Sequence, residues 1–170
     1  MPGTLSLTRK VYLCLAVPFI CCGMLFSSLV SADRGAYLAK IDALLKLSQA
    51  PEGIVFEVIN RDYSFLDWAL PEVEKQSARL RKKFPELDIV IVSHGREMFA
   101  LTEKQQSNNP DLKAHVDFLS RQQIPVYVCG TYAEWQGIAD TDFPENIRVA
   151  AAGPVQINDY IKLGDRKSVV

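Results

Sequence analysis

The sequence predicts an α/β protein, a three-layer α/β/α sandwich around a mostly parallel sheet of four to five strands. Two observations lead to this prediction. Short β-branched, apolar segments alternate with segments of helical periodicity along most of the chain. The strand segments are also apolar on both faces, which is typical of strands that helices cover on both sides. Right-handed crossovers between successive parallel strands place helices on both faces of such a sheet.

The first half of the pattern opens with an amphipathic helix over residues 37–50. The short run GIVFEVIN, residues 53–60, predicts a buried strand. The polar, irregular segment 60–68 predicts a loop. Apolar residues at three- and four-residue steps then predict a helix that starts near Pro71 and ends at Pro85.

The middle of the chain repeats this alternation. The segment ELDIVIVSHG predicts a second strand, and REMFALTEKQQ predicts a short helix. Pro110 opens another helix, with apolar residues on one face. Pro125 ends that helix and starts the third strand, VYVC.

The last part holds a helix, an acidic loop, a strand and a closing helix. The helix TYAEWQGIA is expected to begin with a capping box formed by Thr131 and Glu134. The loop DTDFPEN, the shorter strand IRVAAAG and the helix PVQINDYIKL follow, and Gly164 ends the last helix.

The first 32 residues have the three parts of a signal peptide. Arg9 and Lys10 form a positive start, an apolar run follows, and Val30 and Ala32 occupy the −3 and −1 positions of a cleavage site. We expect cleavage after Ala32, which leaves one domain, residues 33–170, in the periplasm or outside the cell. The alternative is an uncleaved leader that anchors the protein in a membrane, because the apolar run is long enough to span one.

Composition and motifs exclude several classes of function. The 19 basic and 20 acidic residues are nearly balanced, and the one basic cluster, RLRKK, lies late in a predicted helix, so we expect no nucleic-acid partner. No G-x-G-x-x-G or Walker loop follows the first strand, and we expect no cofactor. Asp140, Asp142 and Glu145 lack the spacing of an EF-hand, so we expect a solvated loop and no metal site.

Cysteine use singles out one residue. Cys14, Cys21 and Cys22 lie in the leader, so Cys129 is the only cysteine of the predicted mature chain. Exported proteins usually pair their cysteines, and a single thiol forms no internal disulfide. Cys129 is therefore either a buried core residue or a residue kept for chemistry.

The carboxyl ends of parallel strands are where α/β sheets bind ligands. Cys129 ends the third predicted strand, and His94, followed by Gly95, ends the second. Both belong to this edge. For His94 the sequence leaves two interpretations open, a functional residue and a histidine that bonds to nearby backbone.

At these residues the chain resembles the DsrE/DsrF-like sulfur-relay family, which has the YchN-like fold, and in particular its exported members. GIVFEVI is similar to the first strand of the family, LDIVIVSHGREMFAL to the second strand with its His-Gly turn, IPVYVCGTY to the strand that carries the family cysteine, and AAGPVQINDYIKLG to the last strand and helix. The tail LGDRK lacks the aromatic ending that is common in the family, which leaves the fifth strand open.

The resemblance implies homo-oligomers of three or six chains and, in catalytic members, a persulfide on the cysteine. We therefore expect a sulfur carrier or sulfurtransferase that uses Cys129, assisted by His94, Gly95, Gly130 and Thr131, with a sulfur donor or acceptor protein as partner. If the helix begins at about Thr131, its free N–H groups and dipole favour the thiolate of a partly exposed Cys129. The alternative is a non-catalytic ligand-binding or assembly module in which Cys129 is structural.

Overall fold

The computed structural model describes residues 26–164 and 166–169, with residues 26–34 and 166–169 described by their backbone alone. Most of the predicted leader therefore lies outside the described residues. The helices are α1 (Phe26–Leu45), α2 (Phe65–Lys83), η1 (Arg96–Leu101, a 3₁₀ helix), α3 (Glu103–Asn108), α4 (Pro110–Arg121), α5 (Gly130–Trp135), η2 (Asp140–Asp142, a 3₁₀ helix) and α6 (Gly153–Lys162). The strands are β1 (Gly53–Val58), β2 (Asp88–Ser93), β3 (Val126–Cys129), β4 (Ile147–Ala150) and β5 (Arg166–Val169).

The strands form one sheet in the order β4-β3-β2-β1-β5, and every neighbouring pair is parallel. The predicted fold class is therefore confirmed. The fifth strand, which the sequence left open, is present: β5 pairs with β1, with Phe56 opposite Ser168.

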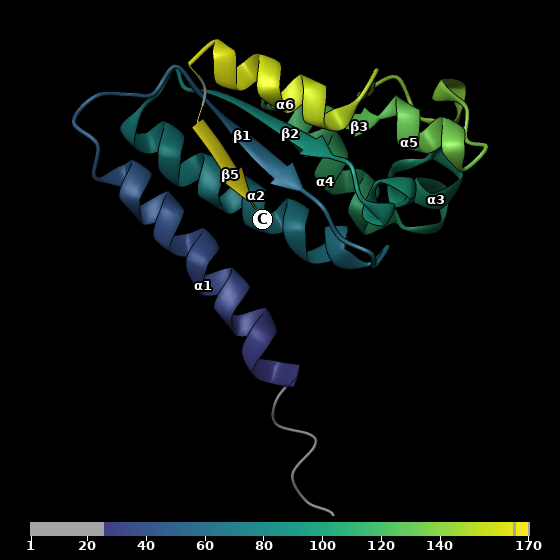
Figure 1. The fold of residues 1–170 in the computed structure, drawn as a ribbon, viewed down its shortest axis with the longest axis horizontal. Coiled ribbons are helices and arrows are strands. Elements are labelled where there is room, and N and C mark those ends of the chain that lie inside the picture. The colour runs from purple at the N-terminus through teal and green to yellow at the C-terminus, as the bar shows by residue number, and fades with distance from the viewer. Residues whose placement is uncertain (1–25, 165, 170) are drawn as a thin grey trace, which may run out of the picture.

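Side chains from alternate positions of each strand enter two hydrophobic clusters on opposite faces of the sheet. One face carries Ile54, Phe56 and Val58 of β1 and packs against α1, α2, η1 and α4. The other face carries Val55, Val90 and Val92 and packs against Ile157 of α6. Figure 1 shows this arrangement, with α6 on one side of the sheet and α1, α2 and α4 on the other.

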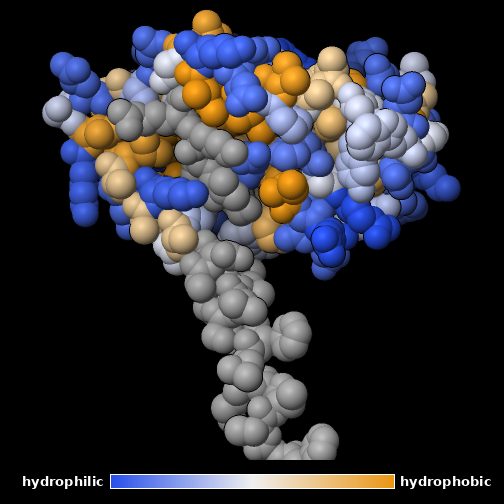
Figure 2. Space-filling model, viewed as in Figure 1, coloured by the Kyte–Doolittle hydropathy of each residue, from blue (hydrophilic) through white to orange (hydrophobic). Residues whose placement is uncertain are grey.

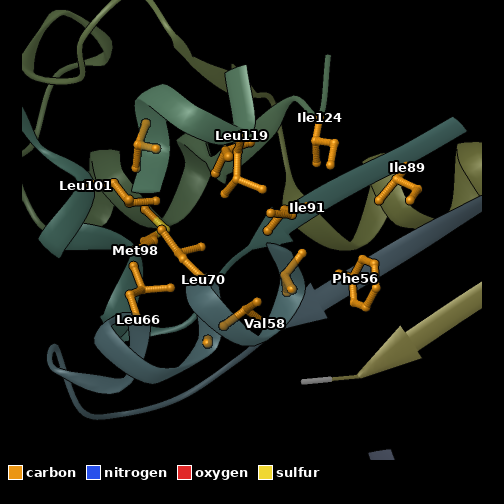
Figure 3. Close-up of a cluster of buried hydrophobic side chains, with 14 of the residues drawn as sticks. Phe56, Val58, Leu66, Leu70, Ile89, Ile91, Met98, Leu101, Leu119 and Ile124 are labelled. Atoms are coloured by element: carbon orange, nitrogen blue, oxygen red, sulfur yellow. The ribbon is translucent and has the colours of Figure 1, made fainter. Parts of the chain in front are cut away.

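The larger cluster lies where the first two crossovers meet the sheet. Figure 3 shows Leu66 and Leu70 of α2 and Met98 of η1 pointing toward Phe56 and Ile91 of the strands. All five side chains are fully buried. Each fully buried side chain of this size stabilises the fold by about 1.5–3 kcal/mol through the hydrophobic effect.

The chain direction explains why α6 stands alone on its face. From β1 to β4, each new strand is added at the same edge of the sheet, so the helices between these strands lie on one face. From β4 the chain returns across the whole sheet to β5, beyond β1. With right-handed crossovers, this reversal carries α6 to the opposite face.

Two predicted elements differ from the structure. The helix predicted to start near Pro71 starts at Phe65, and Pro71 lies inside it. Ser64 N donates to Asp62 Oδ1 in the turn that precedes the helix, and Leu66 is fully buried. This local turn and the buried leucine extend the helix into the segment that was predicted as a loop.

The helix predicted over residues 96–106 is two pieces. The 3₁₀ turn η1 ends at Leu101, and Thr102 is extended, with φ −62° and ψ 150°, before α3 begins. The run Glu97 to Leu101 is entirely buried, so it lacks the exposed face that a longer amphipathic helix presents.

The first helix extends across the predicted cleavage position. Its backbone is helical from Phe26, so Ala32 and Asp33 lie within α1. Among the described residues, no helix has the length and apolar character needed to cross a membrane.

Candidate functional site

A cleft of about 840 Å³ opens at the carboxyl edge of the sheet. It lies over the ends of four strands, where the sequence analysis expects a site. After β1 the lining residues are Ile59, Asn60 and Arg61, after β2 they are His94, Gly95 and Arg96, at and after β3 they are Cys129, Thr131, Tyr132 and Trp135, and after β4 they are Ala152 and Pro154. The volume is in the range of sites for small molecules.

Cys129 borders this cleft but is 6% exposed. The expectation of a partly exposed thiol is therefore wrong for this structure: Cys129 ends a central strand and packs into the larger hydrophobic cluster. Its small exposed surface borders the cleft.

The predicted capping box between Thr131 and Glu134 is absent. The helix α5 begins earlier, at Gly130, and Cys129 is its N-cap residue. Thr131 instead ties β3 to β4, because its Oγ1 donates to Ala151 O at 2.6 Å and its backbone N donates to the same oxygen at 3.1 Å. Thr131 therefore shapes the wall of the cleft.

Gly130 contributes to the same wall of the cleft. A Cβ at Gly130 would lie 3.0 Å from Ala150 O and 3.0 Å from Val149 Cγ1, which is tighter than ordinary contact. The glycine lets the chain turn out of β3 against β4 directly after Cys129.

His94 is paired with a carboxylate from the neighbouring strand. Its Nε2 lies 2.9 Å from Oε1 of Glu57 on β1, and the two side chains are 10% and 11% exposed. The His94 backbone N also donates to Val58 O at 3.0 Å. The backbone bond is made by the main chain of His94, while its ring bonds to a side chain, and His94 lines the cleft.

Gly95 permits a close approach of three segments. A Cβ there would lie 2.2 Å from Glu97 Oε2 and 2.5 Å from Asn60 O. The buried Glu97 carboxylate accepts hydrogen bonds from Ser93 Oγ (2.7 Å), Gly95 N (3.0 Å) and Asn60 N (2.6 Å). Glu97 therefore holds the ends of β1 and β2 together under the cleft.

Gly153, the first residue of α6, packs against the start of both the His94 and the Cys129 side chains. A Cβ at Gly153 would lie 2.6 Å from His94 Cβ and 3.5 Å from Cys129 Cβ. The start of α6 therefore packs directly over both side chains. Of the predicted site residues, Cys129, His94, Gly95 and Thr131 line one cleft, and Gly130 lies between two of them.

Sequence analysis missed Glu57, Arg61, Arg96 and Gly153. One signal was present: Glu57 is an acid inside the otherwise apolar strand GIVFEV, and a charged residue there requires a partner. Arg61 and Arg96 each follow a strand end by a few residues and line the cleft, and the Arg96 guanidinium lies 5.5 Å from the Tyr63 ring centre. Among the described residues no group of three His, Cys, Asp or Glu side chains is arranged to hold a metal ion.

Comparison with solved structures shows the same fold in three proteins. The protein of unknown function MTH1491 from Methanobacterium thermoautotrophicum superposes with a TM-score of 0.58 at 18% identity, over 69% of this chain and 97% of that chain. The ychN protein from E. coli superposes with a TM-score of 0.54 at 17% identity, over 70% and 99%. BT1422, a conserved protein of unknown function from Bacteroides thetaiotaomicron, gives 0.50 at 12%, over 70% and 95%.

No family model matches the chain, and no curated protein matches it. At these low identities the structural likeness establishes the fold, which is YchN-like, and leaves activity to be argued from the site.

Proposed function

We propose that this protein binds and transfers sulfane sulfur as a persulfide on Cys129. The observation that carries the proposal is the position of the thiol. Cys129 lines the cleft at the carboxyl edge of the sheet, together with His94, Arg61 and Arg96. The resemblance of IPVYVCGTY to the cysteine-bearing strand of the sulfur-relay family supports the same role.

The chemistry needs one thiol and no external oxidant. The Cys129 thiolate attacks the outer sulfur of a donor persulfide, the donor S–S bond breaks, and the donor thiolate leaves. Cys129 then carries the sulfur as a persulfide, and an acceptor thiolate removes it by the same exchange. The guanidinium groups of Arg61 and Arg96 favour the anionic species that this exchange involves.

The limited exposure of Cys129 suits a carrier that works outside the cytoplasm. An open thiol in an oxidising compartment is converted to sulfenic and higher acids. At 6% exposure, Cys129 is shielded except through the cleft. We propose export to the periplasm or beyond, with cleavage after Ala32, and a thiol-bearing donor or acceptor protein as the partner that presents sulfur to the cleft.

The test is sulfur loading of the reduced full-length protein with inorganic polysulfide. We expect the tryptic peptide that contains Cys129 to gain the mass of one sulfur atom, and a later incubation with a small thiol to remove it. Cys129→Ser should lose this modification. Failure of the Cys129 peptide to take up sulfur, while the leader cysteines do, would contradict the proposal.

The burial of Cys129 also favours a second candidate from another class. Cys129 belongs to the hydrophobic core cluster, and Trp135 and Ile59 at the cleft are 75% and 54% exposed. In this candidate the cleft binds an apolar ligand or another protein, and Cys129 only fills space. Alkylation of Cys129 solely after denaturation, with no sulfur uptake in the native protein, is the result expected for this candidate.

A further inference from the structure

The strand register places Glu57 and His94 on one face of the sheet and Cys129 at the end of the next strand. Glu57 follows Val55 on the face that α6 covers, and His94 lies two residues beyond Val92 on the same face. Ser93 is opposite Val128 in the pairing of β2 with β3, so His94 and Cys129 are the next positions along the two strands. Side chains alternate along a strand, so Glu57 and His94 share the face that α6 covers. Cys129 contributes to the larger cluster, while its Cβ lies next to the start of α6.

The contacts agree with this register. Imidazole Nε2 of His94 is 2.9 Å from Glu57 Oε1. On its other side, the Cβ atoms of His94 and Cys129 both lie within 4 Å of the point where a Gly153 side chain would begin. The order across the sheet is therefore carboxylate, imidazole, thiol, on β1, β2 and β3.

We infer that Glu57 and His94 form the proton-transfer pair that activates Cys129. The inference rests on the proposed function and adds residue roles to it. Glu57 is a positioning residue, because its carboxylate holds one ring nitrogen and stabilises positive charge on the ring. His94 is the group that takes the thiol proton of Cys129, directly or through one water. Hydrogen bonds between catalytic groups often tighten only when a ligand is bound.

The proton balance of the exchange closes within the site. His94 accepts the proton of the Cys129 thiol, and the resulting thiolate attacks the outer sulfur of the donor persulfide. The donor S–S bond breaks, and His94 returns the proton to the donor thiolate, which leaves as a thiol. Cys129 retains the transferred sulfur, and no electron acceptor is required.

The influence of other charged groups on the thiol has to be distinguished from the influence of His94. Arg61 and Arg96 line the cleft and stabilise a thiolate at any pH. The Glu97 carboxylate is buried under the cleft, where Ser93, Gly95 and Asn60 donate hydrogen bonds to it. Tyr132 also lines the cleft. The arginines keep their charge at every pH, so a pH-dependent loss of reactivity on removal of His94 is the signature of the proton-transfer pair.

The experiment measures the alkylation rate of Cys129 by iodoacetamide from about pH 5 to about pH 10, read from the Cys129 peptide of the full-length protein. In the wild type we expect the alkylation rate of Cys129 to stay high at the low end of this pH range, because an imidazolium stabilises the thiolate beside it. His94→Gln should lower the rate at about pH 6 by at least tenfold and leave the rate at about pH 10 within about twofold, since the thiolate forms there without help. Glu57→Gln should act in the same direction with a smaller effect.

The chain contains a matched control. His115 Nδ1 on α4 lies 2.8 Å from Glu74 Oε1 on α2, and neither residue lines the cleft. His115→Gln and Glu74→Gln remove the same kind of pair and should leave the Cys129 profile unchanged. Circular dichroism and thermal melting establish that each variant is folded.

Two outcomes would overturn the inference. One is a His94→Gln profile that superimposes on the wild type or is lowered equally at every pH. The other, which needs no variant, is a wild-type rate that falls between about pH 8 and about pH 6 as steeply as the rate of a free thiol does. Sulfur loading is a separate measurement. The expected pH profile without sulfur uptake from polysulfide contradicts the persulfide carrier and leaves the proton-transfer pair. Sulfur uptake without the expected pH profile contradicts the pair alone.

Discussion

Gly153 shows at the scale of one residue how a missing side chain makes the site. Its hydrogen faces the Cβ atoms of His94 and Cys129, and a methyl group there would lie 2.6 Å from the former. The neighbouring atom is a Cβ attached to a strand, so it has little freedom to move away.

We therefore expect Gly153→Ala to lower the free energy of unfolding by about 1–3 kcal/mol, the usual cost of overpacking. Urea unfolding followed by circular dichroism measures this change. Gly35 of α1 is the control, because a Cβ there meets nothing within 4 Å. Gly35→Ala should be neutral or stabilising, and an equally stable Gly153→Ala would contradict the crowded packing described above.

Tyr37 is a second residue whose effect has a definite sign. Its side chain is 2% exposed, and its hydroxyl has no hydrogen-bond partner among the described residues. Burial raises the pKa of Tyr37 far above its usual value, and the nearby Glu72 carboxylate raises it further. The folded state therefore keeps the neutral phenol at a pH where the unfolded chain ionises it.

The preference of the folded state for the neutral phenol costs no stability below about pH 10. Above about pH 10 the free energy of unfolding falls by about 1.4 kcal/mol per pH unit because of this group. Tyr37→Phe removes both the unpaired hydroxyl and the ionisation. We expect the variant to be more stable than the wild type by about 1 kcal/mol at neutral pH, with a difference that grows above pH 10. Urea unfolding across pH measures it, and Tyr63→Phe, at an exposed tyrosine, is the control that should leave the pH dependence as it is. A constant difference for Tyr37→Phe would contradict the assignment.

Single residues also mark the limit of the sequence analysis. Cys129 and His94 were identified because each ends a predicted strand, and the position of strand ends follows from local pattern. Their proximity depends on the register between β2 and β3, which local pattern does not contain. The role of Gly153 depends on a helix from the far end of the chain, and so could not be predicted.

At the scale of elements, strands β1 to β4 were predicted to within a few residues because each is a short apolar run between turn residues. The polar strand β5 was left open. The helix boundaries were less well predicted. Pro71 suggested a helix start, yet α2 starts at Phe65 because Leu66 gains a buried position. Tertiary burial outweighed the local preference of proline for the first turn.

The first helix connects the fold to the export proposal. Among the residues of α1 whose side chains are described, 35–45, Tyr37 and Ile41 are buried, and both lie downstream of the proposed cleavage site. A chain that begins at Asp33 keeps these contacts. We expect it to melt within about 4 °C of the full-length protein, a shift that corresponds to about 1 kcal/mol or less.

Two measurements complete this prediction. Ile41→Ala in either chain should lower the free energy of unfolding by about 2–4 kcal/mol, because it opens a cavity in the core. Mass spectrometry of the exported protein should give a chain that starts at Asp33. A mature protein that retains Met1 to Ala32 would favour the anchored alternative.

At the scale of the whole molecule, the described residues leave the two edge strands β4 and β5 with a neighbour on one side only. Within the same residues, α6 is the one helix over its face of the sheet. Val155 and Ile161 of α6 are 56% and 43% exposed, and Figure 2 shows hydrophobic side chains along this helix among polar ones. Open strand edges and apolar patches on one surface are features that proteins commonly cover by association.

We therefore propose that the protein forms a homo-oligomer of three or six chains and that the outer face of α6 contributes to the contact. Light scattering on a size-exclusion column should give a mass three or six times that of one chain at micromolar concentration. Val155→Glu should shift the protein toward a smaller assembly, because a carboxylate buried in an apolar contact is costly.

Phe118 is the control: it is 38% exposed on α4, on the opposite face of the sheet, and Phe118→Glu should keep the assembly intact. Since Pro154 at the start of α6 also lines the cleft, a contact through α6 would place a second chain next to the opening above Cys129. A wild-type monomer at these concentrations, or equal dissociation by both glutamates, would contradict this arrangement.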